Sequence, residues 1–331
     1  MLFPSRATLP LAMLTSAVLL AACGSGLSAS SAPGIGVKNC DTTVMVGKPI
    51  ERAVAINQPA VEMLLSLGLA DRMAGVGLSD NQVLPELKAQ LAGVPAFDKE
   101  FPSFETVLDK DPDFVYATFD YTFTSEGIAD REKFTQLGIP TYQSPSECGG
   151  QDAEQQDALT LDDLYSEIGD VSELFGVPDR GAQLVQSLKT RAAQATTDLG
   201  AENVTLAWWY AGTRTPYIAG CCGAPGIMTR AIGAQNAFED SQQLWPETGW
   251  ESILDRDPTV LVLADLERGG DGDSAADKIR FLESDPVASR LTAVKKKRYI
   301  ILTGTTMDPS VRNVMGIEQL AKGLKSLGVV Q

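Results

Sequence analysis

The stretch Arg52-Ala-Val-Ala-Ile-Asn-Gln-Pro-Ala-Val-Glu-Met-Leu-Leu-Ser-Leu-Gly68 decides the fold, because it passes from one type of secondary structure into another. Residues 53–56 are short and uniformly apolar, which is typical of a buried strand. Asn57 then offers an N-cap, and a proline, a glutamate and leucines at helical spacing follow it, which predicts a helix. Residues 73–76 return to a strand pattern. The stretch therefore predicts a strand, helix, strand unit and a parallel sheet.

A second pattern occurs twice, once in each half of the chain. Residues 104–117 predict a short helix, an Asp-Pro turn and a strand, and residues 250–263 repeat the same order. A further strand is expected at 141–143. Repetition at corresponding places indicates two similar units. We therefore expect an α/β fold with two Rossmann-like lobes, each built on a central, mainly parallel sheet.

One long helix is predicted between the two halves, over residues 178–199. Its apolar stripe consists of Leu184, Val185, Leu188, Ala192, Ala195 and Leu199, and 22 residues at 1.5 Å each give a length of roughly 33 Å. This helix is expected to join an N-terminal lobe (37–177) to a C-terminal lobe (200–331). The alternative is an ordinary helix packed inside one lobe.

The N-terminus predicts export. Arg6 precedes an apolar run, residues 9–20, that is too short to span a bilayer comfortably. Leu20-Ala-Ala-Cys23 resembles the lipobox of bacterial lipoproteins, so we expect a signal peptide (1–22), acylation of Cys23 and a flexible tether (23–36). The alternative is a plain secretory signal with an incidental cysteine.

Charge and composition exclude several function classes. The chain has 27 Lys and Arg against 43 Asp and Glu, a net charge of −16, which makes nucleic acid an unsuitable partner. It contains no histidine, so the commonest general base and metal ligand is missing. No Gly-x-Ser-x-Gly elbow or phosphate-binding loop is present either. We expect a protein that is not an enzyme and has no metal site of its own.

Four cysteines follow Cys23, which is an even number in a compartment that permits disulfides. Four cysteines allow three pairings, and their spacing does not choose among them. The interpretation favoured here is Cys40–Cys148 with Cys221–Cys222, the second as a staple of a glycine-rich loop. Free thiols and a bridge between the lobes are the alternatives.

An ordered set of phrases resembles the substrate-binding proteins of iron-siderophore, haem and cobalamin ABC importers. The resemblance covers about residues 50–330, and no single phrase decides it. The phrases are Arg52–Gly68, Pro102–Glu105 with Asp111–Val115, Leu161–Leu164 with Phe175-Gly176, Gly249–Glu251 with Asp257-Pro258, and Leu282–Pro286.

The resemblance implies two Rossmann-like lobes joined by one long helix, with a ligand held in the cleft between them. It implies a monomer, lipid-anchored at the outer face of the cytoplasmic membrane, that captures a ferric siderophore or haem and delivers it to a membrane permease. Iron would enter only as part of the bound chelate or haem, with no other cofactor. A cobalamin-binding protein is one alternative, and an envelope scaffold or biogenesis factor on the same fold is another.

Ligands of doubly wound sheets bind beyond the carboxyl ends of the strands, so the loops that follow the strands supply the candidates. In the N-terminal lobe these are Asn57 and the alternating aromatics Phe119, Tyr121 and Phe123. Aromatic faces suit stacking on a catecholate, hydroxyphenyl or porphyrin ring. The alternation also fits an ordinary half-buried strand.

In the C-terminal lobe, alternation places Trp208 and Trp209 on opposite faces of a strand, so one of them is expected in the core. Aromatics and cations near the strand ends provide the further ligand candidates. The alternative for either arginine is an ordinary surface charge. These candidates are Trp209, Tyr210, Arg214, Tyr217, Trp245 and Arg312.

Two glutamates occupy matching positions in the repeated pattern. Glu105 stands in the first copy and Glu251 in the second. In the resembled family such acids dock into basic pockets of the permease, so we expect these two to bind a partner. The alternative is that both are ordinary exposed glutamates.

Overall fold

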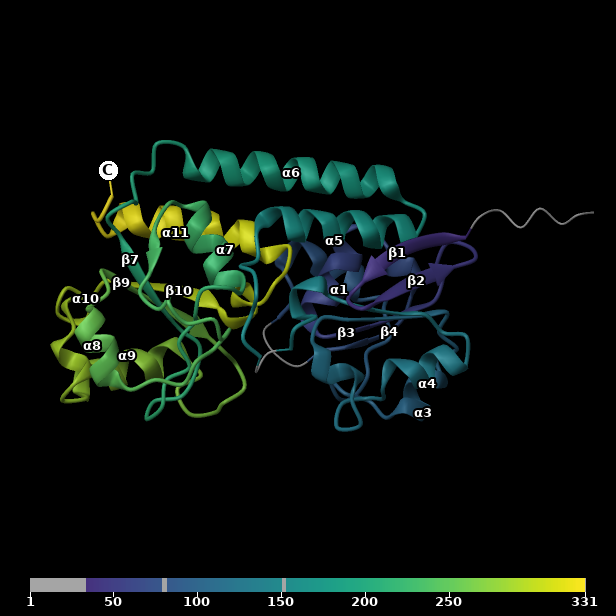
Figure 1. Cartoon of the computed structure of the whole chain (residues 1–331), viewed down its shortest axis with the longest axis horizontal. Helices are drawn as coiled ribbons and strands as arrows, with labels where there is room; N and C mark the ends of the chain where they lie inside the picture. Colours follow the sequence, from purple (N-terminus) through teal and green to yellow (C-terminus); the bar gives the residue numbers. More distant parts are fainter. Residues whose placement is uncertain (1–33, 79–81, 151–152, 331) are drawn as a thin grey trace, which may run out of the picture. The chain divides into compact units, whose positions relative to one another are not determined.

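The N-terminal lobe folds around a four-stranded parallel sheet. The computed structural model describes residues 34–78, 82–150 and 153–330, which Figure 1 draws as coloured ribbons. Across the sheet the strands lie in the order β4 (Met73–Gly77), β3 (Ala53–Ile56), β5 (Phe114–Ala117) and β6 (Thr141–Gln143). Helix α1 (Gln58–Ser66) connects β3 to β4, so the predicted strand, helix, strand unit is confirmed.

The C-terminal lobe repeats this topology. Its parallel sheet has the order β8 (Gln235–Asn236), β7 (Thr205–Trp209), β9 (Val260–Asp265) and β10 (Tyr299–Thr303). In both sheets the first strand along the chain lies between the second and the third, and the fourth forms an edge. The two Rossmann-like lobes expected from the sequence are therefore present.

Short helices connect the strands in corresponding places. In the N-terminal lobe they are α2 (Lys88–Leu91), α3 (Phe104–Leu108) and α4 (Arg131–Gln136). In the C-terminal lobe they are α7 (Ala224–Ala231), α8 (Trp250–Arg256), α9 (Ala275–Ser284) and α10 (Thr292–Lys295). The predicted Asp-Pro turns follow α3 and α8, and both aspartates, Asp111 (φ 49°) and Asp257 (φ 37°), have the left-handed backbone that aspartate tolerates.

Helix α6 (Pro178–Thr196) joins the lobes and ends three residues earlier than predicted. It packs on α5 (Leu161–Leu174) of the first lobe and on α11 (Arg312–Ser326) of the second, and Figure 1 shows it lying along both helices. The bridging role is therefore confirmed over a helix packed inside one lobe. Within the described part of the chain, every helix is too short or too polar to cross a membrane.

One apolar core is shared by both lobes. It includes Leu64 of α1, Ile168 of α5, Leu188 of α6 and Val314 of α11, together with the inner face of each sheet. The outer face of the first sheet packs with α3 and α4 in a separate cluster. The outer face of the second packs with α8 and α9 in another. Both sheets are thus covered on both faces, as parallel sheets require.

A hairpin precedes the first lobe and is tied to it by a disulfide. Strands β1 (Ile35–Asn39) and β2 (Thr42–Val46) pair antiparallel, so the predicted tether is too long by two residues. The signal peptide, Cys23 and the rest of the tether lie outside the described residues. The structure pairs Cys40 with Cys148 and Cys221 with Cys222, which is the favoured pairing.

The hairpin also protects the exposed edge of β6. The carboxamide of Asn39 donates to the carbonyl of Gln143 (2.7 Å) and accepts from its backbone N–H (3.0 Å). The Arg131 guanidinium donates to the hydroxyl of Thr141 (2.9 Å) and to its backbone carbonyl (2.7 Å). These side chains take the place of a further strand, which prevents the edge from pairing with another chain.

Glu167 of α5 is a buried carboxyl group in the first lobe. It accepts hydrogen bonds from the Tyr116 hydroxyl (2.7 Å) and the Ser144 hydroxyl (2.9 Å). Burial raises the pKa of Glu167 to about 7, and the two hydrogen bonds oppose that rise only in part. The folded protein therefore keeps a proton on Glu167 at pH values at which the unfolded chain has lost it.

We predict that Glu167→Gln changes the pH dependence of stability. Between about pH 4.5 and pH 7 the unfolded chain binds fewer protons than the folded protein, so the wild type loses roughly 1 kcal/mol per pH unit from this group. The variant lacks that loss and should gain stability relative to the wild type as the pH rises. Urea unfolding at several pH values measures the difference. A difference that stays constant across this window would contradict the raised pKa.

Candidate functional site

The carboxyl ends of the parallel strands bring the candidate side chains together within each lobe. In the first lobe Asn57 follows β3 and Thr118 follows β5. In the second, Tyr210 follows β7 and Leu266 follows β9. Because β3 corresponds to β7 and β5 to β9 in the repeated topology, the same two loops face the same edge of each sheet.

The side chain of Asn57 holds the loop after β5 in place through hydrogen bonds. Its side-chain oxygen accepts from the backbone N–H groups of Thr118 (3.2 Å) and Phe119 (3.3 Å) and from the Thr122 hydroxyl (3.1 Å). Its side-chain nitrogen donates to Glu100 (2.9 Å). The residue is fully buried and has a φ of 72°. The prediction of direct ligand contact is therefore wrong for Asn57, because its polar atoms are engaged in positioning a neighbouring loop.

Three aromatic rings form the aromatic ledge of the first lobe: Phe101, Phe119 and Tyr121. The rings of Phe119 and Tyr121 stack at 5.2 Å, and Phe101 meets Tyr121 edge-on at 5.7 Å. Tyr121 is 38% exposed, whereas Phe119 and Phe123 are buried. Phe123 packs against Phe134 in the core. The loop is a short 3-10 helix (Asp120–Phe123) rather than a strand, so Tyr121 alone of the three predicted aromatics presents much surface.

Both tryptophans of β7 belong to cores. Alternation places them on opposite faces as predicted, with Trp208 in the shared core and Trp209 in the outer core. Trp209 is 1% exposed, and its indole N–H donates to the carbonyls of Ala211 and Gly212. The expectation that Trp209 contacts a ligand is therefore wrong. Both faces of a covered parallel sheet are apolar, so alternation does not leave one tryptophan exposed.

A cation–aromatic cluster, defined as Tyr210, Trp245 and Arg268, lies where β7 and β9 end. The rings of Tyr210 and Trp245 are 4.9 Å apart, and the Arg268 guanidinium lies 5.4 Å from the centre of the Tyr210 ring. Tyr210 and Trp245 are half-buried, so each retains exposed surface. Arg268 was not predicted from the sequence, although it follows β9 as Phe119 and Tyr121 follow β5.

Arg268 is held by a buried acid. Its guanidinium donates to the carboxylate of Asp273 at 2.9 Å. Burial opposes ionisation of Asp273, but hydrogen bonds from Arg268 and from the backbone N–H of Gly270 lower its pKa. Behind it, the buried Lys278 donates to the Asp273 carbonyl (2.7 Å), and burial lowers the pKa of Lys278 to about 8. The loop after β9 is therefore firmly anchored.

A surface recess of about 540 Å³ adjoins this cluster and contains two more predicted residues. Arg214 is exposed on its rim. Tyr217 is 39% exposed, and its hydroxyl donates to Glu247 (3.1 Å). Asp271 closes one side, and the pKa of its carboxyl is lowered chiefly by the backbone N–H and hydroxyl of Thr213, with a smaller contribution from Arg214. Tyr210, Arg214, Tyr217 and Trp245 thus lie in one region, and their contact with a ligand stays a prediction.

Arg312 is not at the surface. Its guanidinium forms a two-pronged ion pair with Glu62 of α1, with Nε to Oε2 at 2.6 Å and Nη2 to Oε1 at 2.5 Å. The two side chains are 2% and 0% exposed. The prediction that Arg312 is a cleft contact is wrong, because its guanidinium is buried and paired with Glu62 inside the protein.

Glu105 and Glu251 occupy equivalent places. Each is the second residue of its helix, α3 or α8, and each is exposed. Hydrogen bonds from backbone N–H and from the Ser103 hydroxyl lower the pKa of Glu105, so it is anionic at neutral pH. Both helices cover the outer faces of their sheets. The pair therefore forms two matched acidic positions, one on each lobe.

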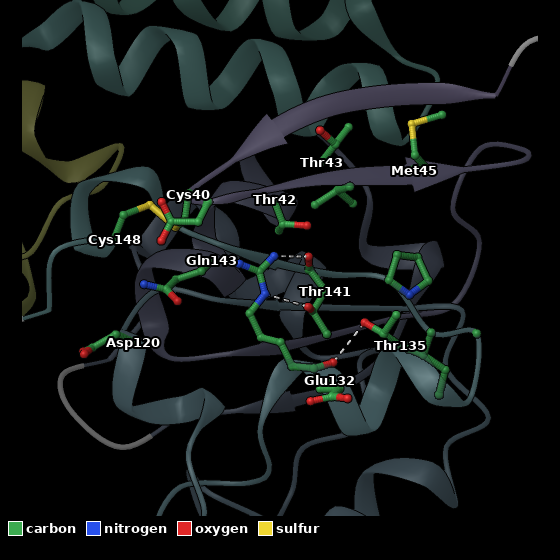
Figure 2. Close-up of a pocket in the computed structure, with 16 residues that line it drawn as sticks. Cys40, Thr42, Thr43, Met45, Asp120, Glu132, Thr135, Thr141, Gln143 and Cys148 are labelled. Carbon is green, nitrogen blue, oxygen red and sulfur yellow. Dashed lines mark hydrogen bonds between the residues drawn. A yellow bond between two sulfur atoms is a disulfide. The ribbon is translucent and has the colours of Figure 1, made fainter.

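Other polar recesses offer less chemistry. The recess of about 710 Å³ in Figure 2 lies beside β6, and its arginine, Arg131, is used to protect the strand edge. Across residues 34–78, 82–150 and 153–330, the acidic side chains and cysteines nowhere gather into a group of three suited to a metal ion. The carboxyl ends of the strands remain the region with exposed aromatic and cationic groups.

We predict that Asn57 is required for order in the loop 118–124. Asn57→Gly keeps the backbone free to adopt a positive φ but removes four hydrogen bonds, and it should cost about 2 kcal/mol. Asn57→Ala adds backbone strain of about 1 kcal/mol or more. Denaturant unfolding and hydrogen exchange of the loop measure both effects. Unchanged loop protection in the glycine variant would show that the side chain does not hold the loop.

Comparison with known proteins agrees with this architecture. The chain is 23% identical over 233 residues to a vitamin B12-binding protein of Vibrio parahaemolyticus serotype O3:K6, covering 69% of this chain and 76% of that protein. A periplasmic binding protein from Veillonella parvula has the same fold, with a TM-score of 0.78, 22% identity, and coverage of 88% and 98%.

An ABC-type Fe3+-hydroxamate transport protein from Saccharomonospora viridis is also similar, with a TM-score of 0.72, 26% identity, and coverage of 87% of this chain and 98% of that one. The sequence profile described as periplasmic binding protein matches residues 54–306. The chain therefore belongs to the periplasmic binding protein family.

Proposed function

We propose that the protein is the ligand-capturing component of an iron-uptake ABC importer and binds a ferric siderophore or haem between its lobes. The cation–aromatic cluster at the ends of β7 and β9 carries this proposal. Tyr210 and Trp245 offer ring faces for stacking, and Arg268 offers a guanidinium for oxygen anions. Tyr121 of the aromatic ledge supplies a further exposed ring. The hydroxamate-transport structure among the similar proteins supports the same ligand class.

Cobalamin is the second candidate ligand. The relative from Vibrio parahaemolyticus is a vitamin B12-binding protein, and aromatic side chains also suit a corrin ring. Cobalamin lacks the anionic iron-coordinating oxygens of a catecholate or the two propionates of haem, so it would use the rings of the cluster more than its arginine.

We further propose that the protein works outside the cytoplasm as a monomer anchored through acylated Cys23, and that it delivers its ligand to a permease without catalysing a reaction. Family membership supports an extracytoplasmic location. The lipobox-like Leu20-Ala-Ala-Cys23 supports the anchor. Glu105 and Glu251 supply the two docking positions for the permease, because matched exposed acids suit basic pockets.

The ligand is identified by tryptophan fluorescence of the purified full chain. We predict saturable quenching by one of four probes: a ferric hydroxamate, a ferric catecholate, haemin or cobalamin. Trp245 is half-buried beside Tyr210, so Trp245→Phe should remove most of the signal change. Tyr210→Ala and Arg268→Gln should each weaken binding by tenfold or more, since central aromatic and arginine contacts are worth at least about 1.4 kcal/mol.

The control for this titration is Trp250→Phe, which changes a buried ring on the outer face of the sheet. It should keep both the affinity and the quenching. Folding of each variant is checked by thermal unfolding. If none of the four probes quenches the folded wild type, the iron-uptake proposal and the cobalamin alternative are both rejected.

Docking is tested by charge reversal. Glu105→Arg with Glu251→Arg should reduce uptake by cells at least tenfold and leave ligand affinity unchanged, because both residues lie on the outer helices. The matched control reverses Asp109 and Asp255, which are exposed at the other ends of the same helices. If uptake survives the glutamate reversal, or falls equally with the control, these glutamates are not part of the docking surface.

A further inference from the structure

Among the described residues, one buried ion pair joins the two lobes. Glu62 belongs to α1 of the first lobe and Arg312 begins α11 of the second. Their two parallel contacts of 2.6 and 2.5 Å are shielded from water, with side-chain exposures of 0% and 2%. Each charged group therefore depends on the other lobe for its counter-charge.

The remaining polar atoms of the pair are also hydrogen-bonded, three times within a lobe and once across the boundary. Glu62 accepts additional hydrogen bonds from the Gln58 side chain (3.1 Å) and from the Leu84 backbone N–H (3.0 Å). Arg312 donates to the Gln82 carbonyl (2.8 Å) and to the Thr303 hydroxyl (3.2 Å). The guanidinium is thus bonded to groups of both lobes and fits one relative position of them.

The energetics make this contact sensitive to distance. Burying one unpaired charge costs several kcal/mol, which the partner offsets only while both contacts remain at hydrogen-bond length. A separation of the lobes by one or two ångströms would leave two buried charges without compensation. The pair therefore penalises displacement more steeply than apolar contacts, whose attraction is spread over many atoms.

The pair also joins elements that are next to those of the proposed ligand site. Five residues before Glu62, at the start of the same helix, Asn57 holds the loop of the aromatic ledge. On the other side, the hydrogen bond of Arg312 reaches Thr303, the last residue of β10. The ion pair thus connects the helix that follows β3 in the first sheet with the carboxyl end of β10 in the second.

We infer that Glu62 and Arg312 form an inter-lobe clamp that fixes the spacing of the two strand edges between which the ligand binds. They are positioning residues and do not contact the ligand. The clamp sets the width of the cleft before the ligand arrives. The inference rests on the proposed binding between the lobes, but not on which ligand is correct.

Hydrogen exchange of the full chain tests the clamp without any ligand. Arg312→Gln and Glu62→Gln should each raise exchange at least tenfold at Leu84, in α1 and in the first turn of α11. Amides of the central strands β5 and β9 should keep their wild-type rates. The double variant should exchange no faster than the singles, because the contact can be lost only once.

The matched control is the second ion pair that α11 makes with another helix. Arg191 of α6 binds Glu318 of α11 at 2.7 Å, but these side chains are 41% and 35% exposed. Arg191→Gln should leave exchange at the lobe boundary unchanged, because water replaces the lost contact. If Arg312→Gln does not fold, Glu62→Asp keeps the charge but shortens the side chain, and it should give a smaller increase at the same amides.

Two results would overturn the inference. Wild-type exchange at Leu84 and α11 in the folded variants would show that the pair does not hold the lobes. An equal increase in β5 and β9 would show that it contributes only to global stability. Neither result depends on ligand binding, so failure of the clamp is distinguishable from failure of the proposed iron-uptake function.

Discussion

The structure depends on the need to cover both faces of two parallel sheets with one chain. The inner faces share a single apolar core, to which α1, α5, α6 and α11 contribute from both lobes. Separating the lobes would expose that core to water at about 25 cal/mol per Å² and would also break the buried Glu62–Arg312 pair. Non-directional apolar burial keeps the lobes together, and the directional ion pair selects one arrangement of them.

Sharing the inner core leaves the outer faces free to carry a different role. There each sheet is covered by short helices, with α3 on the first sheet and α8 on the second. A short helix exposes a large part of its first turn, and its N-terminus favours acidic side chains. Glu105 and Glu251 lie in those turns. The repeated topology thus places matched acids on surfaces that the shared core does not use.

The order of elements could be predicted from the sequence because strands, Asp-Pro turns and the helical stripe of α6 are local patterns. The burial of individual side chains could not be predicted from the sequence. Asn57 is an N-cap candidate in the sequence, but its three donors belong to a loop some 60 residues later. Arg312 finds its acid 250 residues away. Trp209 follows strand alternation, yet helices cover both faces of its sheet.

The repeat could have indicated Arg268. The aromatic loop after β5 was predicted from its rings, and β9 occupies the same position in the second sheet. The loop after β9 contains no aromatic residue among Leu266–Asp273, so a search for rings missed it. Its contribution to the site is a cation placed over Tyr210, a ring that belongs to a different strand end.

The net charge of −16 argues against an anionic ligand only if distant charges act on the site. At physiological ionic strength, exposed charges are largely screened beyond about 8 Å, so nearby groups dominate. The charges of Arg268 and Asp273 sum to zero, but the arginine side chain is 40% exposed and the aspartate side chain only 4%. A ligand approaching the cluster therefore meets the guanidinium, with the carboxylate behind it. At the cluster the member of the pair that faces outward is the cation, whereas the adjoining recess carries Asp271 as well as Arg214.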